Sequence, residues 1–242
     1  MKLIFNLILR VIDFFYKKKI ILFFKESLGD NLNVLIDVGA HKGETIHEFI
    51  SNFKIKNIYS FEASPKTFLH LQVKLKKIRK KFNQTNIEIF NFGAGNANKK
   101  NIFYELSDSN SSTFNIIDRN SSYYKKKNKI LSLFFMRDKS TIMETDVLQI
   151  KLGEFMNEKK ITDVDVLKID TEGYEFEVLK GLDQEISRIK FIYFEHHYDN
   201  MIKKNYKYSD IHEYLKKKGF HKVFKIKMPL RKSFDYVYKK TI

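Results

Sequence analysis

The sequence predicts an α/β fold in which a mostly parallel sheet is covered by helices and binds its ligand at one edge. Short apolar runs rich in β-branched residues alternate with segments of helical spacing along the 242 residues. A glycine-bearing turn follows the first of these runs, and acidic residues stand at the ends of four of them. In open parallel sheets, ligands bind at the edge where the carboxyl ends of the strands meet.

The first apolar run, at residues 34–38, leads into the turn Gly39-Ala40-His41-Lys42-Gly43 and then into helical spacing from Thr45 onward. Glycine permits the sharp bend and the close approach of a ligand, although an ordinary βα turn would also explain these residues. The turn lacks the middle glycine of a dinucleotide fingerprint and the Gly-Lys-Ser/Thr ending of a P-loop. Asp37, at the carboxyl end of the strand, suits a ligand with an ammonium group, such as the methionine end of S-adenosylmethionine.

A second strand is predicted at 58–61, with Glu62 at its carboxyl end. Glu62 follows Asp37 at close to the ~20-residue interval at which a βαβ unit places an acid on a ribose. We therefore predict that the Glu62 carboxylate accepts hydrogen bonds from ribose hydroxyls. A helix cap or a solvated acid is the alternative interpretation of Glu62.

Ser64-Pro65 predicts the start of a helix that extends to about residue 81. A third strand is predicted at 86–92, and the small residues Gly93 and Ala94 after it leave room for an adenine ring against the backbone. The segment 107–145 is the least regular, because it begins with a serine-rich polar stretch and then becomes basic. Such an insertion is usually a surface loop, and an acceptor-binding lid is the alternative.

Two further strands are predicted at 164–169 and 191–194. Asp170 and Glu172 follow the first of these strands, and Glu195, His196 and His197 follow the second. Because parallel strands point the same way, these residues should meet Asp37 and Glu62 along one rim of the sheet. A hydrogen-bonded structural role is the alternative for each histidine.

Composition limits the class of protein. Hydrophobic residues at 43% and aromatic residues at 15% predict a folded chain, with one α/β domain at 31–242. The absence of cysteine excludes disulfides and cysteine-ligated zinc. The net charge of +16 could indicate nucleic acid, an anionic membrane or an acidic substrate. However, lysines are spread along the whole chain, so a nucleic-acid partner is not expected.

The N-terminal extension, residues 1–30, is apolar and aromatic as far as residue 28. Arg10, Asp13 and Lys17 to Lys19 divide it into pieces shorter than the ~20 apolar residues of a membrane span. The sequence lacks the small-residue cleavage site of a signal peptide, so a cytoplasmic protein is predicted. We expect a helix that packs on the domain or joins a homo-oligomer and is dispensable for cofactor binding. The alternative is a basic amphipathic helix at a membrane surface.

Taken together, these motifs resemble the FkbM family of S-adenosylmethionine-dependent methyltransferases. The matching segments are 36–43, 61–65, Ser111-Ser112, 147–155, 167–175 and 178–181. Two departures from the family pattern are visible. His41 stands where an asparagine is more usual, and Gly93 stands where an alanine is commoner.

The resemblance implies a Rossmann-like class I methyltransferase fold: a seven-stranded, mostly parallel sheet with helices on both faces and an antiparallel last strand. It implies S-adenosyl-L-methionine as cofactor and O-methylation of a hydroxyl on a sugar, a glycan or another small-molecule acceptor. The residues implied to bind the cofactor are Asp37, Gly39, Ala40, His41, Gly43, Glu62, Gly93 and Ala94.

Methyl transfer to a hydroxyl requires alignment of the reacting atoms and removal of a proton. A carboxylate or an imidazole can take that proton, or a divalent metal ion can lower the pKa of the hydroxyl. The candidates for either route are Asp170, Glu172, Glu195 and His196. Two rival interpretations are a binding protein that kept the fold but lost transfer, and an RNA methyltransferase, which only the net charge suggests.

Overall fold

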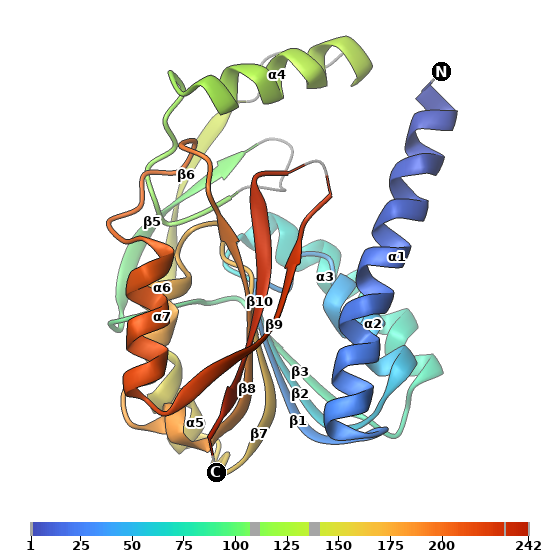
Figure 1. Ribbon diagram of the computed structural model, residues 1–242, viewed down its shortest axis with the longest axis vertical. Helices are drawn as coiled ribbons and strands as arrows, with labels where there is room; N and C mark the ends of the chain where they lie inside the picture. Colours follow the sequence, from blue (N-terminus) through green and yellow to red (C-terminus); the bar gives the residue numbers. More distant parts are fainter. Residues whose placement is uncertain (1, 107–111, 136–140, 230, 242) are drawn as a thin grey trace.

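The structure, a computed structural model, describes residues 2–106, 112–135, 141–229 and 231–241 (Figure 1). Its main sheet has seven strands. In sheet order they are β3 (Asn86–Phe90), β2 (Lys54–Phe61), β1 (Asn31–Val38), β7 (Val164–Ile169), β8 (Ile189–His197), β10 (Ser233–Lys240) and β9 (Phe220–Lys227). Neighbouring strands from β3 to β8 are parallel, and β10 is antiparallel to both β8 and β9. The predicted mostly parallel sheet with an antiparallel last strand is confirmed.

Helices cover both faces of this sheet (Figure 1). On one face lie α1 (Lys2–Leu28), α2 (Glu44–Asn52) and α3 (Pro65–Lys81), and on the other lie α5 (Leu152–Glu158), α6 (Glu175–Lys180) and α7 (Tyr208–Lys217). A short 3-10 turn, Glu185–Arg188, precedes β8. Each face has its own apolar core, because central strands such as β7 are buried on both sides.

The local sequence explains where α3 begins. The Ser64 hydroxyl accepts a hydrogen bond from the backbone amide of Thr67 at 3.1 Å, and Pro65 occupies the first helical position. Both features are favoured at helix N-termini, since Ser satisfies a free amide and Pro lacks one. This start places the end of β2, and with it Glu62, at the edge of the sheet.

A second, three-stranded sheet lies beside the main one and was largely missed by the sequence analysis. It contains β4 (Gly93–Gly95), β6 (Ile142–Lys151) and β5 (Lys99–Leu106), in that order. Helix α4 (Ser122–Phe135) also lies within the segment that was expected to be a loop. The sequence did not predict β6, because this strand has mixed polarity and is mostly not buried. Residues 107–111 and 136–140 of that segment lie outside the described residues.

The second half of α1 packs into the core of the main domain. Ile20, Ile21 and Phe24 are buried against the face of the sheet, and the Phe24 ring lies 5.6–6.0 Å from the rings of Phe49, Phe191 and Tyr193. The chain after α1 leads directly into β1 through Gly29 (Figure 1). No described helix is long and apolar enough to cross a membrane.

Candidate functional site

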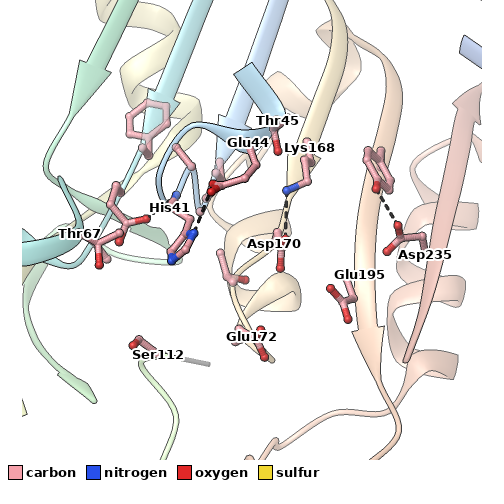
Figure 2. Close-up of a pocket in the computed structure, with 18 of the residues that line it drawn as sticks. His41, Glu44, Thr45, Thr67, Ser112, Lys168, Asp170, Glu172, Glu195 and Asp235 are labelled. Carbon is pink, nitrogen blue, oxygen red and sulfur yellow. Dashed lines mark hydrogen bonds and ion pairs between the residues drawn. The ribbon is translucent and has the colours of Figure 1, made fainter. Parts of the chain in front are cut away.

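A cavity of about 500 Å³ lies at the carboxyl edge of the main sheet. Its walls come from the ends of β1, β2, β7 and β8, from β4 and β10, and from α1 and α2. The predicted site residues that line it are Gly39, Ala40, His41, Glu62, Gly93, Ala94, Asp170, Glu172 and Glu195. The rim predicted from the strand ends therefore exists, and most of the predicted side chains meet there (Figure 2).

The turn after β1 requires glycine at its first position. Gly39 has a φ of 86°, and a Cβ built on it would lie 1.8 Å from the backbone oxygen of Asp170. Both the backbone conformation and the contact therefore exclude a side chain. The close approach joins the ends of β1 and β7, because the Asp170 amide also donates to the Val38 carbonyl at 2.9 Å.

His41 has a positive φ of 49°, a conformation that asparagine adopts more readily than most side chains. Its backbone amide donates to Oε2 of Glu62 at 2.7 Å, and the Ser64 amide donates to Oε1 of Glu62 at 2.9 Å. Gly43 follows as the N-cap residue of α2, also with a positive φ. The carboxylate of Glu62 thus ties the glycine turn to the start of α3 and still lines the cavity. Burial raises its pKa to about 7, although the two amides oppose this.

Asp37 lies beneath the cavity rather than in its lining. Its carboxylate is fully buried, with neither oxygen hydrogen-bonded, and its Oδ1 is 3.9 Å from Nζ of Lys168 on β7. Burial raises the pKa of Asp37 to about 6, and the Lys168 ammonium opposes that shift. A direct contact between Asp37 and a ligand therefore stays a prediction, whereas the contact with Lys168 belongs to the fold.

Lys168 also contacts Asp170, whose Oδ2 is 3.1 Å from Nζ (Figure 2). Burial tends to raise the pKa of Asp170, but the Lys168 charge and hydrogen bond outweigh it and lower the pKa. Burial in turn tends to lower the pKa of Lys168, and Asp170 and Asp37 outweigh it and raise the pKa. Asp170 is therefore an ionised carboxylate at the floor of the cavity.

The predicted adenine-side residues are closely packed. A Cβ on Gly93 would lie 2.3 Å from the ring of Phe114, so this position needs glycine. The Phe114 ring in turn lies 4.9 Å from that of Phe103 and 5.1 Å from that of Tyr174. Phe103 and Phe114 line the cavity beside Ala94, which gives this end an apolar, aromatic surface. Ser112 lines the cavity as well, while Ser111 lies outside the described residues.

Glu172, which follows β7, forms a charged group with Glu195 and His197 of β8, and the two glutamates line the cavity. Nε2 of His197 lies 3.2 Å from Oε2 of Glu172 and 3.2 Å from Oε1 of Glu195. Burial raises the pKa of Glu172 to about 7 and also raises that of Glu195, while the His197 charge opposes both shifts. These two carboxylates therefore titrate closer to neutral pH than exposed ones do.

His196 is not part of this group, which corrects the sequence prediction. Its ring is buried on the opposite face of β8, with ring centres 4.8–5.9 Å from those of Tyr198, Tyr206 and Tyr208. Successive side chains of a strand point to opposite faces, so His196 cannot share the face of Glu195 whereas His197 can. Burial lowers the pKa of His196 to about 3.

Among the described side chains, no group of three or more histidine, aspartate or glutamate residues is placed to hold a metal ion. The divalent-metal route thus stays a prediction of the sequence.

The comparisons with known proteins identify the family. The model of the methyltransferase FkbM domain matches residues 37–222, which include the glycine turn and all four acidic strand ends. The chain belongs to the FkbM methyltransferase family. This family consists of S-adenosylmethionine-dependent methyltransferases, as the motifs had implied. A search of curated proteins gave no match.

Solved structures agree with this FkbM fold. The FkbM methyltransferase from Methylobacillus flagellatus KT is similar at a TM-score of 0.56 and 15% identity, over 86% of this chain and 44% of that one. The chain thus spans less than half the length of that relative. Magnesium protoporphyrin IX methyltransferase from Synechocystis PCC 6803, solved with bound S-adenosylmethionine, is similar at a TM-score of 0.52 and 11% identity. The similarity covers 96% of this chain and 82% of that one. M. capricolum TrmK, solved with S-adenosylhomocysteine, is similar at a TM-score of 0.50 and 11% identity, over 91% of this chain and 67% of that one.

Several residues of this FkbM site were missed by the sequence analysis. Lys168 could have been found, because it lies two residues before Asp170 on a strand and so shares its face. His197 was placed on the rim but not among the candidates for proton removal, although the same reasoning gives it the face of Glu195. Tyr16 on α1 and Asp235 on β10 gave no sequence signal, since only the packing of α1 and the last strand brings them to the cavity.

Proposed function

We propose that this FkbM methyltransferase transfers a methyl group from S-adenosylmethionine to a hydroxyl oxygen of a sugar, a glycan or another small-molecule acceptor. The observation that carries the proposal is one cavity with two unlike ends. One end combines the glycine turn, Glu62 and the Phe103–Phe114 surface, and the other combines Asp170, Glu172 and Glu195.

The first end fits the cofactor. Glu62 offers carboxylate oxygens for ribose hydroxyls, and the aromatic rings offer an apolar surface for adenine. Gly39 and Gly93 allow this end to form, because a side chain at either position would overlap Asp170 or Phe114. When bound, S-adenosylmethionine supplies a sulfonium methyl group that is already activated. Asp37 contributes negative charge from beneath the turn, although Lys168 shares that charge.

The second end fits the removal of a proton from the acceptor hydroxyl. A general base works best when its pKa is close to the working pH, and burial raises the pKa of Glu172 to about 7. Glu195 has the same surroundings and a pKa shifted in the same direction. Asp170 is held ionised by Lys168 and is suited to orient the hydroxyl. We therefore assign the base to Glu172 or Glu195 and not to His196.

His197 has a supporting role in this proposal. Burial tends to lower its pKa, but Glu172 and Glu195 outweigh burial and raise the pKa to about 10. An imidazolium at neutral pH does not accept a proton, so His197 fixes the two carboxylates instead. A bound divalent ion that lowers the pKa of the hydroxyl is the second route that we keep open.

The exposed side of α1 supports a proposal about location. Phe14 and Phe15 are 61% and 57% exposed, and Lys18 and Lys19 are exposed next to them. Aromatic and basic side chains on one helix surface are typical of contact with anionic membranes, so we propose a cytoplasmic protein that attaches peripherally through residues 1–28. A homo-oligomer that covers the same residues is the alternative. Flotation with anionic and neutral vesicles and light scattering of the free protein distinguish the two.

Calorimetry with S-adenosylmethionine and S-adenosylhomocysteine tests the cofactor. Transfer of labelled methyl to a panel of glycosides, glycans and RNA, with and without a chelator, then tests the acceptor and the metal. We expect binding of both cofactor forms and transfer to a hydroxylated small molecule, which Glu172→Gln or Glu195→Gln reduces by at least tenfold. A folded protein that binds neither cofactor form would be a binding protein that lost transfer, and transfer to RNA alone would refute the small-molecule acceptor.

A further inference from the structure

Helix α1 forms one wall of the cavity. Asp13, Tyr16, Lys17, Ile20 and Ile21 all line the cavity from this helix. They lie next to lining residues from β8 and β10, which are the strands on the acceptor side of Asp170. The N-terminal helix is therefore a part of the site as well as of the core.

A pair of tyrosines fixes this wall through a single carboxylate. The Tyr16 hydroxyl donates to Oδ2 of Asp235 at 2.5 Å, and the Tyr193 hydroxyl donates to the same oxygen at 2.7 Å. All three side chains are buried and line the cavity. Tyr16 is the only one of the three on α1, so its hydroxyl ties the helix to the sheet at the acceptor end.

Asp235 also neighbours the proposed base. It is the direct cross-strand partner of Glu195 in the antiparallel pair of β10 and β8 (Figure 2). Glu195 is buried and lines the cavity, and its Oε1 lies 3.2 Å from Nε2 of His197. A carboxylate can accept more than one hydrogen bond, so a hydroxyl of a bound acceptor can bind Glu195 as well.

The charge of the lining is opposite to that of the whole chain. Among the described lining residues eight are acidic, whereas three are lysine or arginine, although the chain carries a net +16. Two of the three cations are paired: Lys17 lies 2.9 Å from Asp13, and Lys168 lies 3.1 Å from Asp170. The third, Arg231, is attracted by Glu195 and Glu172. The lining thus carries more carboxylates than cations, although His197 and Arg231 offset part of the charge of Glu172 and Glu195. An anionic group would be disfavoured there.

We infer that α1 is the acceptor-binding wall of the cavity, with Tyr16 as its positioning residue, and that this wall accepts hydroxylated molecules without an anionic group at the reacting end. The inference rests on the proposed methyltransferase function. Tyr16 holds Asp235 and α1 in place, and the carboxylates of Asp235 and Glu195 receive hydroxyl donors of the acceptor.

The test uses the full chain saturated with S-adenosylhomocysteine, whose binding is measured first by calorimetry. Saturation-transfer NMR then compares the methyl glycosides of three hexoses with the corresponding uronates, which match in ring size and carry one carboxylate. Tyr16→Phe removes the hydroxyl and keeps the ring. Tyr208→Phe is the matched control, because its hydroxyl bonds with that of Tyr238 on the other face of the sheet and does not line the cavity.

We expect the neutral glycosides to bind and the uronates to bind at least tenfold more weakly. Tyr16→Phe should weaken glycoside binding about threefold to tenfold, the usual effect of one hydrogen bond, with unchanged affinity for S-adenosylhomocysteine. Asp235→Asn should also weaken glycoside binding. This second variant keeps the inference testable if Tyr16→Phe destabilises the fold.

Equal binding of uronates, no binding of any neutral glycoside, or equal effects of Tyr16→Phe and Tyr208→Phe would each overturn the inference. Failure of S-adenosylhomocysteine to bind would instead contradict the proposed function itself. The two failures are therefore distinguishable within one experiment.

Discussion

Nε2 of His197 lies 3.2 Å from Oε1 of Glu195, two residues earlier on the same face of β8. The imidazole is buried, and it also lies 3.2 Å from Oε2 of Glu172 and 3.5 Å from Oδ2 of Asp199. Because the carboxylates outweigh burial and raise its pKa to about 10, His197 is a fixed positive charge at neutral pH. The geometry of the acceptor end depends on this charge.

The first prediction concerns the pH dependence of stability. The folded pKa of His197 is about 10, above its ordinary value of 6.5, so the folded state binds the proton more tightly. Its contribution is therefore fully present below about pH 6.5 and is lost as the pH rises to 10. The difference in unfolding free energy between wild type and His197→Gln should fall by on the order of 2–4 kcal/mol from pH 7 to pH 10.

Denaturant unfolding at several pH values measures that difference. His196→Gln is the control, since burial lowers the pKa of His196 and keeps it neutral over the whole range. Its difference from wild type should stay constant from pH 7 to pH 10. A constant difference for His197→Gln as well would show that the imidazole is not charged.

The second prediction concerns the turn after β1. Gly39→Ala should cost about 3 kcal/mol or more and abolish cofactor binding, because the new Cβ would overlap the Asp170 carbonyl. Gly29→Ala is the matched control, since Gly29 also has a positive φ but nothing lies within 4 Å of a Cβ there. It should cost only about 1 kcal/mol and leave binding unchanged. Thermal unfolding and calorimetry with S-adenosylhomocysteine test both variants, and similar results for the two would contradict the contact.

The third prediction concerns the buried ammonium of Lys168. Lys168→Met should destabilise the fold by about 3–5 kcal/mol at pH 8, because it leaves the fully buried Asp37 and the partly exposed Asp170 without their counterion. Part of this loss should be recovered at pH 5, where Asp37, with a pKa of about 6, takes up a proton. Lys190→Met serves as the control, since Lys190 pairs with Asp163 and Asp165 from a half-exposed position. Urea unfolding at the two pH values decides, and equal losses for both lysines would argue against a special role of Lys168.

The fourth prediction concerns α1, which the sequence had suggested to be dispensable for cofactor binding. Phe24→Ala should destabilise the whole domain by about 3–5 kcal/mol, because the ring is fully buried against the sheet. Leu22→Ala, at an exposed position of the same helix, should change stability by less than about 0.5 kcal/mol. A single cooperative transition for Phe24→Ala, shifted to lower denaturant, would show that α1 unfolds with the domain. A small shift of the unfolding midpoint would indicate that α1 contributes little to the stability of the domain.

The sequence was sufficient for the main sheet and for most of the residues at strand ends that line the cavity. Apolar runs, the glycine turn and the acids at strand ends are local features of the sequence. Because the strands are parallel, the residues at their carboxyl ends meet at one edge of the sheet. Gly39, Glu62, Asp170 and Glu195 line the cavity for that reason. The prediction for His196 was wrong, because successive side chains of a strand point to opposite faces. His197, and not His196, therefore shares the face of Glu195.

The acceptor end was decided by the tertiary structure. Tyr16 and Asp235 are 219 residues apart, and no periodicity or motif connects them. They meet because α1 packs its apolar side on the sheet and because β10 inserts between β8 and β9. Hydrophobic packing is non-directional, so a sequence shows that such a helix will be buried somewhere but not which cavity its tyrosine will face. The charged pairs around Lys168 and His197 depend likewise on distances that only the folded chain defines.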